Sequence, residues 1–224
     1  MNKIYNKIVQ EICDSKREIL LVAVTKNVDT DTTNEIIRDG ALAIGENRIE
    51  VFEDKEASLL PVEKHFIGQI QSKKIKKIVK LFDVIQSVGS IKHLRKINDE
   101  AISQGKDIRV LLQFNISGET QKGGFNPLDT KQVISGIGGI EGVSIVGVMG
   151  MATDTDDTEI IKNQFRQLRA IRDDFSLVYP DMVELSMGMS NDYRIAIEEG
   201  ASVLRVGSVL FEGGVINLGD AVVV

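Results

Sequence analysis

The sequence of 224 residues contains one cysteine, three prolines and no long apolar run. Cys13 has no second cysteine to pair with, and the first residues are polar and helix-like, unlike a secretory signal, so we expect a reducing, cytoplasmic setting. No stretch approaches the ~18 consecutive apolar residues that a membrane-spanning helix needs, so we expect no membrane partner. No proline-rich or serine-rich linker divides the chain, and we predict one domain over residues 1–224.

An excess of positive charge is also lacking. Lys and Arg number 27 against 33 Asp and Glu, a formal net charge of −6, whereas proteins that bind phosphate backbones concentrate cations. We therefore expect no nucleic-acid partner. The lysine-rich segment 73–80 (KKIKKIVK) carries its apolar residues on one helical stripe, which predicts a solvated helix face, with an anionic partner as the alternative. His65 and His93 are far apart and have no cysteine neighbours, so we predict no metal site.

Eight short apolar runs alternate with longer segments in which apolar residues recur every three or four positions, a pattern typical of βα units. The predicted strands are Ile19–Thr25, Ala41–Gly45, His65–Gly68, Val84–Val88, Arg109–Asn115, Ser144–Met149, Met182–Ser186 and Val203–Gly207. The predicted helices are Lys3–Lys16, Thr32–Asp39, Arg48–Ser58, Ser72–Leu81, Ile91–Gln104, Pro127–Ile137, Thr158–Phe175 and Ser190–Glu199. An open doubly wound sheet also fits, but eight repeats without a central break favour a single (β/α)8 TIM-type barrel with an additional N-terminal helix.

Functional residues of such a barrel lie just after the strands, because the carboxyl ends of the strands form its active face. Lys26 directly follows the first run, ILLVAVT, which predicts an amine at the barrel mouth. Burial between walls of low dielectric would favour the neutral amine, the form that attacks a carbonyl carbon. The alternative is that Lys26 is simply the first solvated residue after a strand.

Two glycine-containing loops follow the seventh and eighth runs, and both suit an anion. Residues 184–192 (ELSMGMSND) pass from a strand through a turn into a predicted helix, and the N–H groups of such a turn favour negative charge. In residues 204–208 (LRVGS), Gly207 permits a close approach to a ligand and Ser208 can donate hydrogen bonds. Barrels often build phosphate sites from these loops, so we predict phosphate binding. The alternative is a capped helix start and a tight strand exit.

Arg205 lies two residues before Gly207, so both residues project to the same face of an extended strand. An arginine that faces the barrel interior keeps its charge and needs hydrogen-bond acceptors. We therefore expect an acceptor for Arg205 in the site, with a solvated position at the barrel rim as the alternative.

Seven blocks of sequence carry a family pattern: VAVTK at 22–26, GENRIE at 45–50, HFIGQIQSKK at 65–74, NISGETQKGGF at 115–125, GVMGM at 147–151, LSMGMSNDYRIAIEEGA at 185–201 and LRVGSVLFEG at 204–213. They span nearly the whole chain in the family's order. Together they resemble the YggS/PROSC family, also called the pyridoxal phosphate homeostasis proteins. The resemblance implies a fold similar to the N-terminal barrel domain of alanine racemase.

The resemblance also implies a cofactor, pyridoxal 5′-phosphate, held as a Schiff base on Lys26. By motif position it assigns the phosphate to residues of the last two loops, the pyridine nitrogen to Arg205 and a place close to the ring to Asn47. The residues implied to hold the phosphate are Ser186, Met187, Ser190, Gly207 and Ser208. Two positions depart from the family pattern, since Gln69 replaces a histidine and Gly150 replaces a residue with a hydroxyl.

Arg205 also bears on whether the protein is an enzyme. A guanidinium donates hydrogen bonds and accepts none, so opposite the ring nitrogen it leaves that nitrogen unprotonated and weakens the ring as an electron sink. Alanine racemase, by the family comparison, also uses a tyrosine from a second domain, which we do not expect in this sequence. We therefore predict a monomeric pyridoxal phosphate carrier with little or no catalysis, which buffers the cofactor or delivers it to apo forms of pyridoxal phosphate-dependent enzymes.

Two enzymatic alternatives stay open. The first is an amino-acid racemase that uses Lys26 and a second acid, for which Tyr193 or Cys13 could be considered, although neither is well placed in the sequence. The second is a barrel aldolase that binds a sugar phosphate in the same loops and forms its Schiff base with the substrate.

Overall fold

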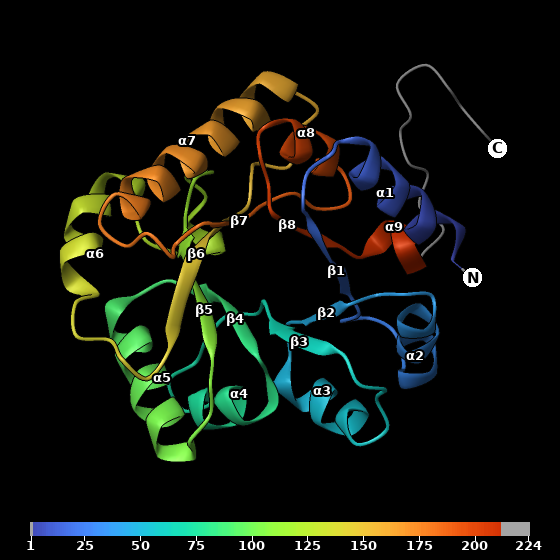
Figure 1. Ribbon diagram of the computed structural model, residues 1–224, viewed down its shortest axis with the longest axis horizontal. Coiled ribbons are helices and arrows are strands. Elements are labelled where there is room, and N and C mark those ends of the chain that lie inside the picture. Colours follow the sequence, from blue (N-terminus) through green and yellow to red (C-terminus); the bar gives the residue numbers. More distant parts are fainter. Residues whose placement is uncertain (1, 212–224) are drawn as a thin grey trace.

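Eight parallel strands form a closed barrel in the computed structural model, which describes residues 2–211 (Figure 1). The strands pair in chain order, and β1 closes the ring against β8, with Val22 beside Arg205. They are β1 (Leu20–Val24), β2 (Ala43–Glu46), β3 (Glu63–Phe66), β4 (Val84–Val88), β5 (Arg109–Phe114), β6 (Ser144–Gly150), β7 (Glu184–Ser186) and β8 (Val203–Val206). The closed ring confirms the predicted (β/α)8 barrel and excludes the open sheet.

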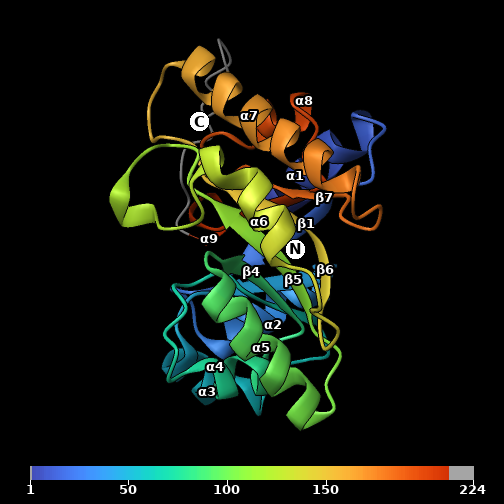
Figure 2. The ribbon, with the colours of Figure 1, turned by 90° about the vertical axis from the view of Figure 1, so that its left-hand side faces the viewer.

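Each predicted helix is present, with some ends shifted. The α-helices are α1 (Lys3–Asp14), α2 (Thr30–Arg38), α3 (Ile49–Glu56), α4 (Ile75–Leu81), α5 (Ile91–Gln104), α6 (Thr130–Gly136), α7 (Thr158–Ser176), α8 (Tyr193–Glu198) and α9 (Ser208–Phe211). Two 3-10 turns, η1 (Thr120–Lys122) and η2 (Pro127–Asp129), follow β5. The helices surround the strands in Figure 1, and Figure 2 shows α5, α6 and α7 along one side of the molecule. No helix within residues 2–211 is both long and apolar enough to cross a membrane.

The start of α8 differs from the prediction, because the helix begins at Tyr193 and not at Ser190. The Oδ1 atom of Asp192 accepts a hydrogen bond of 2.5 Å from the N–H of Met189, and this bond closes a turn ahead of the helix. Gly188 enters that turn with a φ of 91°, a conformation that favours glycine. Ser190 therefore lies in a loop at the end of the barrel and is not a helix cap.

The apolar core has two parts. The larger part lies between the strands and the helices and contains fully buried rings such as Phe52, Phe82 and Phe165. Inside the barrel, alternate residues of each strand point toward the axis, and they form two small apolar clusters. These clusters consist of Val22, Ala43 and Val203, and of Val84, Leu111 and Met149. Buried polar side chains, among them Gln86, Ser186 and Arg205, also lie in the barrel interior.

The additional N-terminal helix, α1, packs beside the last described elements of the chain. Asn2 donates from its amide to the carbonyl of Leu210 at 2.7 Å. Glu11 accepts from the Tyr193 hydroxyl at 2.9 Å and forms an ion pair of 2.9 Å with Arg194. These contacts connect α1 to α8 and α9, which together cover one side of the barrel.

Candidate functional site

A cavity of about 790 Å³ opens where the carboxyl ends of the strands meet. Its wall includes residues that directly follow β1, β2, β6, β7 and β8, so the fold gathers them from distant parts of the sequence. The lining residues are Val24, Lys26, Asn27, Val28, Asn47, Ile67, Lys122, Met149, Met151, Ala152, Asp154, Met189, Ser190, Asn191, Asp192, Arg205, Gly207, Ser208 and Phe211. The location agrees with the general rule for (β/α)8 barrels.

Six of the eight residues predicted for the site line this cavity: Lys26, Asn47, Ser190, Arg205, Gly207 and Ser208. The structure does not bring Ser186 and Met187 to the cavity wall. The Ser186 hydroxyl points into the barrel interior and bonds to Gln86 and Arg205. Met187 is fully buried in the outer core, and its N–H donates to the carbonyl of Val203, so that group is not available to a phosphate.

The loops after β7 and β8 meet at Ser190 and Gly207. The Ser190 hydroxyl accepts a hydrogen bond from the Gly207 N–H at 3.4 Å. A Cβ atom at position 207 would lie 3.0 Å from both the Cβ and the carbonyl oxygen of Val24, so the end of β8 passes closer to β1 than most residues allow. Ser190, Gly207 and Ser208 thus border one corner of the cavity, and the hydroxyls of Ser190 and Ser208 can donate there. Such a group of donors suits an anion.

Arg205 is 4% exposed and lies inside the barrel, as predicted, not at a solvated rim. Its Nη1 donates to Ser186 Oγ at 2.6 Å and its Nη2 to the carbonyl oxygen of Gly150 at 2.9 Å. Burial lowers the pKa of Arg205 to about 10, and the charge of Asp192 works against that shift. The guanidinium is therefore charged at neutral pH and offers donors to the cavity that it lines.

Lys26 lies at the cavity mouth and is exposed, so the predicted burial of its amine is wrong for the structure as described. The residues beneath it are well buried. Thr25 Oγ1 donates to Glu46 Oε1 at 2.7 Å, and Lys55 Nζ donates to the same carboxylate oxygen at 2.9 Å and to the Thr25 carbonyl at 2.8 Å. This buried triad, formed by Thr25, Glu46 and Lys55, fixes the end of β1 directly before Lys26.

Asn47 lines the cavity and carries a buried acceptor. Its Oδ1 atom is buried and has no hydrogen-bond partner among residues 2–211. The Asn47 backbone is in close contact with Gly68, where an added Cβ would lie 2.1 Å from the Asn47 carbonyl oxygen. Such a distance is impossible for a real side chain, so Gly68 is needed to let the loops after β2 and β3 pack together. A buried acceptor without a partner is costly, which indicates a site that receives a donor.

Comparisons with known proteins agree with this geometry. The model of the alanine racemase N-terminal domain family matches residues 21–214. The pyridoxal phosphate homeostasis protein of Aquifex aeolicus is 32% identical over 194 residues, which cover 85% of each chain, and that of Schizosaccharomyces pombe is 33% identical over 200 residues, covering 87% of this chain and 84% of the relative. The chain belongs to the pyridoxal phosphate homeostasis protein family.

Solved structures give the same result. PipY of Synechococcus elongatus, solved with pyridoxal phosphate bound, superimposes with a TM-score of 0.82 at 30% identity, covering 91% of this chain and 99% of PipY. Alanine racemase of Clostridium difficile superimposes with a TM-score of 0.77 at 14% identity, covering 91% of this chain but 57% of the racemase. The second likeness establishes the fold alone.

The two departures from the family pattern do not reach the cavity wall. Gln69 is exposed and does not line the cavity. A side chain at Gly150 would contact Ile116 and Leu168 at about 3.0 Å, on the outer side of the barrel. The backbone carbonyl of Gly150 accepts a hydrogen bond from Arg205, which does line the cavity. A missing hydroxyl at this position therefore leaves the cavity wall unchanged.

Several lining residues escaped the sequence prediction. Asp192 was interpreted as part of a helix start, but it is buried at the cavity wall, where burial raises the pKa of its carboxyl. Lys122 lies in η1, and its Nζ donates to the Ala152 carbonyl at 2.7 Å, across to the loop after β6. The motif at 115–125 contains this loop, but nothing in its residues predicted that Lys122 would line the cavity. Met189 lies in the 184–192 loop that was singled out from the sequence, but it was not predicted for the site, and Asp154 carries no sequence signal.

Proposed function

We propose that this protein binds pyridoxal 5′-phosphate in the cavity, covalently through Lys26, and serves as a carrier in cofactor homeostasis with little or no catalysis. The observation that carries the proposal is the meeting of Lys26, the Ser190–Gly207–Ser208 corner and Arg205 in one cavity. The names of the relatives and the bound cofactor of PipY support it. A cytoplasmic, monomeric carrier that serves apo-enzymes is part of the same proposal.

The residues present fit this cofactor. Ser190 and Ser208 would hold the phosphate through their hydroxyls, and Gly207 between them would allow its close approach. The unpartnered Oδ1 of Asn47 would accept a hydrogen bond from a group on the ring. The Lys26 amine would condense with the aldehyde carbon, forming a C=N bond and releasing one water. When bound, the cofactor supplies that aldehyde and a ring that withdraws electrons from it.

Arg205 supports a carrier more than an enzyme. It is charged and donor-only, so a ring nitrogen beside it acts as an acceptor and stays unprotonated. An unprotonated ring stabilises a carbanion poorly. Ser186, which we predicted to hold the phosphate, instead acts on the site by holding Arg205.

The second acid of a racemase also lacks a good candidate among the two residues considered. Tyr193 is buried against α1, where its hydroxyl donates to Glu11, and burial together with that contact raises the pKa of Tyr193 to about 12. Cys13 is exposed on α1. Neither residue lines the cavity.

Absorption spectroscopy tests the proposal. Purified protein mixed with pyridoxal phosphate is expected to show the absorption band of a protein-bound imine, and Lys26→Ala is expected to lose it. Lys73→Ala, which removes an exposed lysine outside the cavity, controls for nonspecific reaction with lysines and keeps the band. Absence of the band in the natural protein, or an equal band in Lys26→Ala, refutes the proposal.

The enzymatic alternatives have separate signatures. Lys26-dependent exchange of the α-hydrogen of L- and D-alanine into deuterated water would favour the racemase. Aldol cleavage of a sugar phosphate without added pyridoxal phosphate would favour the aldolase.

A further inference from the structure

A continuous chain of hydrogen bonds runs through the barrel interior, from the cavity wall to the opposite ends of the strands. It is built from Arg205 on β8, Ser186 on β7, Gln86 on β4, and His65 and Glu63 on β3, and we call it the polar file. Each of its four bonds measures 2.6 Å: Arg205 Nη1 to Ser186 Oγ, Ser186 Oγ to Gln86 Oε1, Gln86 Nε2 to His65 Nδ1, and His65 Nε2 to Glu63 Oε1.

The middle of the polar file is closed to solvent. Ser186 and Gln86 are fully buried, and His65 is 1% exposed. A donor or acceptor left unpaired there would cost about 1–3 kcal/mol. The bonds are therefore constrained to a pattern in which every donor meets an acceptor.

Arg205 and Glu63 fix the direction of that pattern from its two ends. Because a guanidinium donates and never accepts, Ser186 Oγ accepts from Arg205. The single Ser186 proton then needs an acceptor of its own, and Gln86 Oε1 receives it at 2.6 Å. The amide nitrogen of Gln86 then faces His65 Nδ1, which must accept. His65 therefore carries its proton on Nε2 and donates it to Glu63.

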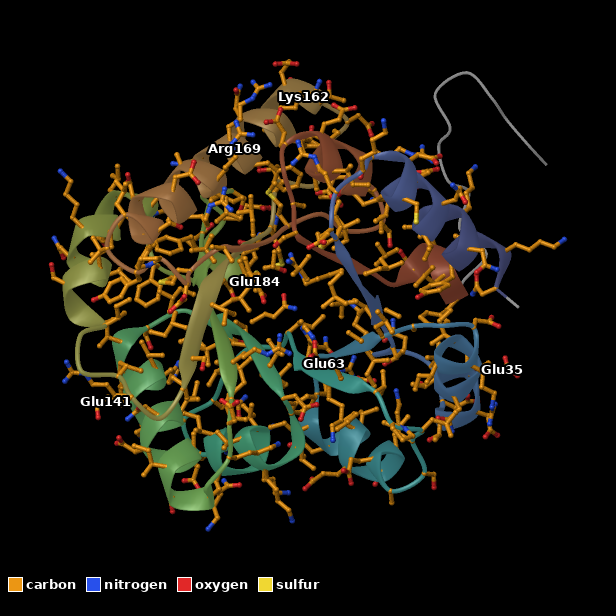
Figure 3. The ribbon with its side chains drawn as sticks, viewed as in Figure 1. Glu35, Glu63, Glu141, Lys162, Arg169 and Glu184 are labelled. Carbon is orange, nitrogen blue, oxygen red and sulfur yellow. The ribbon has the colours of Figure 1, made fainter. Side chains whose placement is uncertain are left out.

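The Glu63 end of the polar file is anchored by charge. The hydrogen bond from His65 lowers the pKa of Glu63, and Arg109 also donates to the Glu63 carboxylate. Glu184 lies across from them, with an oxygen 3.9 Å from Arg109. Figure 3 shows Glu63 and Glu184 inside the ring of helices, and each begins its strand at the end remote from the cavity. Glu63 is thus a fixed acceptor, as Arg205 is a fixed donor.

We propose that Gln86 and His65 are positioning residues for the cofactor site: by orienting the Ser186 hydroxyl they hold the Arg205 guanidinium at the cavity wall. Gln86 is the residue that decides the arrangement, because it alone in the file contacts both Ser186 and His65. The effect on the cofactor rests on the function proposed above, whereas the protonation pattern of the file does not.

The protonation pattern is testable without any ligand. The chain contains two histidines, so side-chain 15N NMR of the uniformly labelled protein is assigned with one variant, His93→Gln. At neutral pH, His65 is expected to show a protonated Nε2 and an unprotonated Nδ1. In Gln86→Glu, which keeps size and shape, both oxygens accept, so His65 Nδ1 must donate and both ring nitrogens are expected to be protonated. A His65 proton on Nδ1 in the natural protein, or an unchanged His65 in Gln86→Glu, overturns the assignment.

The positioning role is tested by pyridoxal phosphate affinity. Gln86→Met fills the same space but leaves the Ser186 proton without an acceptor, and we expect about tenfold weaker binding, the effect of one hydrogen bond to a charged group. Gln86→Glu keeps that acceptor and is expected to bind within about twofold of the natural protein. Equal affinities of the two variants overturn the positioning role. If the natural protein binds no pyridoxal phosphate, the proposed function fails, and the NMR result still decides the polar file.

Discussion

Lys55→Met is expected to be one of the most costly single substitutions in this protein, because it breaks the buried triad beneath Lys26. Lys55 is 5% exposed and Glu46 is 1% exposed, and their side chains are joined at 2.9 Å. The second oxygen of Glu46 has no partner among residues 2–211, so the carboxylate depends on Lys55 and on the Thr25 hydroxyl. Met retains most of the apolar stem of lysine, which confines the change to the charge and its two hydrogen bonds.

The expected loss follows from the asymmetry of buried ion pairs. Removing one partner leaves an uncompensated charge in the interior and costs about 3–5 kcal/mol, whereas replacing both partners by apolar residues is often nearly neutral. We therefore expect Lys55→Met to lower the free energy of unfolding by about 3–5 kcal/mol, and Lys55→Met combined with Glu46→Leu to recover most of that loss.

Urea unfolding followed by circular dichroism measures both values. Lys77→Met provides a matched control, since Lys77 pairs with Glu53 at 2.8 Å but both side chains are largely exposed, and we expect a much smaller loss there. A loss below about 1 kcal/mol in Lys55→Met, or no recovery in the double variant, would refute the reasoning.

Three further predictions concern single residues. Burial and the Glu11 contact raise the pKa of Tyr193 to about 12, so its stabilising contribution is complete below about pH 10 and is lost as the pH rises through about 12. Urea midpoints measured over this range should therefore fall less in Tyr193→Phe than in the natural protein. Burial, and then the neighbouring lysines, lower the pKa of His93, so its NMR titration midpoint should lie below the ordinary value of about 6.5, and stability should be lost as the pH falls through that window; a midpoint at or above the ordinary value would contradict this. Gly68→Ala forces a Cβ into the Asn47 backbone, so thermal and urea unfolding should show a loss of at least about 2 kcal/mol, together with weaker pyridoxal phosphate binding; unchanged stability would show that the two loops can separate freely.

The barrel itself was predictable, because its evidence is local. Most strands are buried on both faces and therefore appear in the sequence as short apolar runs. One exception is β3, which begins with Glu63 and Lys64, so the predicted third strand, His65–Gly68, lies two residues too far along the chain. The additional helix α1 was predicted from the spacing of its apolar residues. The predicted start of α8 was wrong, because the turn closed by Asp192 and Met189 replaces the first helical turn at Ser190. Several neighbouring residues could cap the helix, and the sequence alone does not show which of them does so. The short helix α9 was not predicted, since four residues carry too little periodicity to be recognised.

The candidate site was predicted from motif positions, and the prediction missed contacts that cross the barrel interior. Ser186 lies in the same motif as Ser190, but β7 ends at Ser186, so its side chain still follows the alternation of the strand and points along the barrel interior. His65 was considered as a metal ligand and rejected, yet its role depends on Gln86 and Glu63, one of which lies 21 residues away. Hydrogen bonds across a closed barrel join residues that no local pattern relates.

Reduction with borohydride, followed by digestion and mass spectrometry, tests the central claim most directly. The protein is loaded with pyridoxal phosphate, reduced and cleaved, and the modified peptide is sequenced. We expect the reduced cofactor on the ε-nitrogen of Lys26, in near-stoichiometric amount. Modification at another lysine, or recovery of the Lys26 peptide unmodified, would contradict the account.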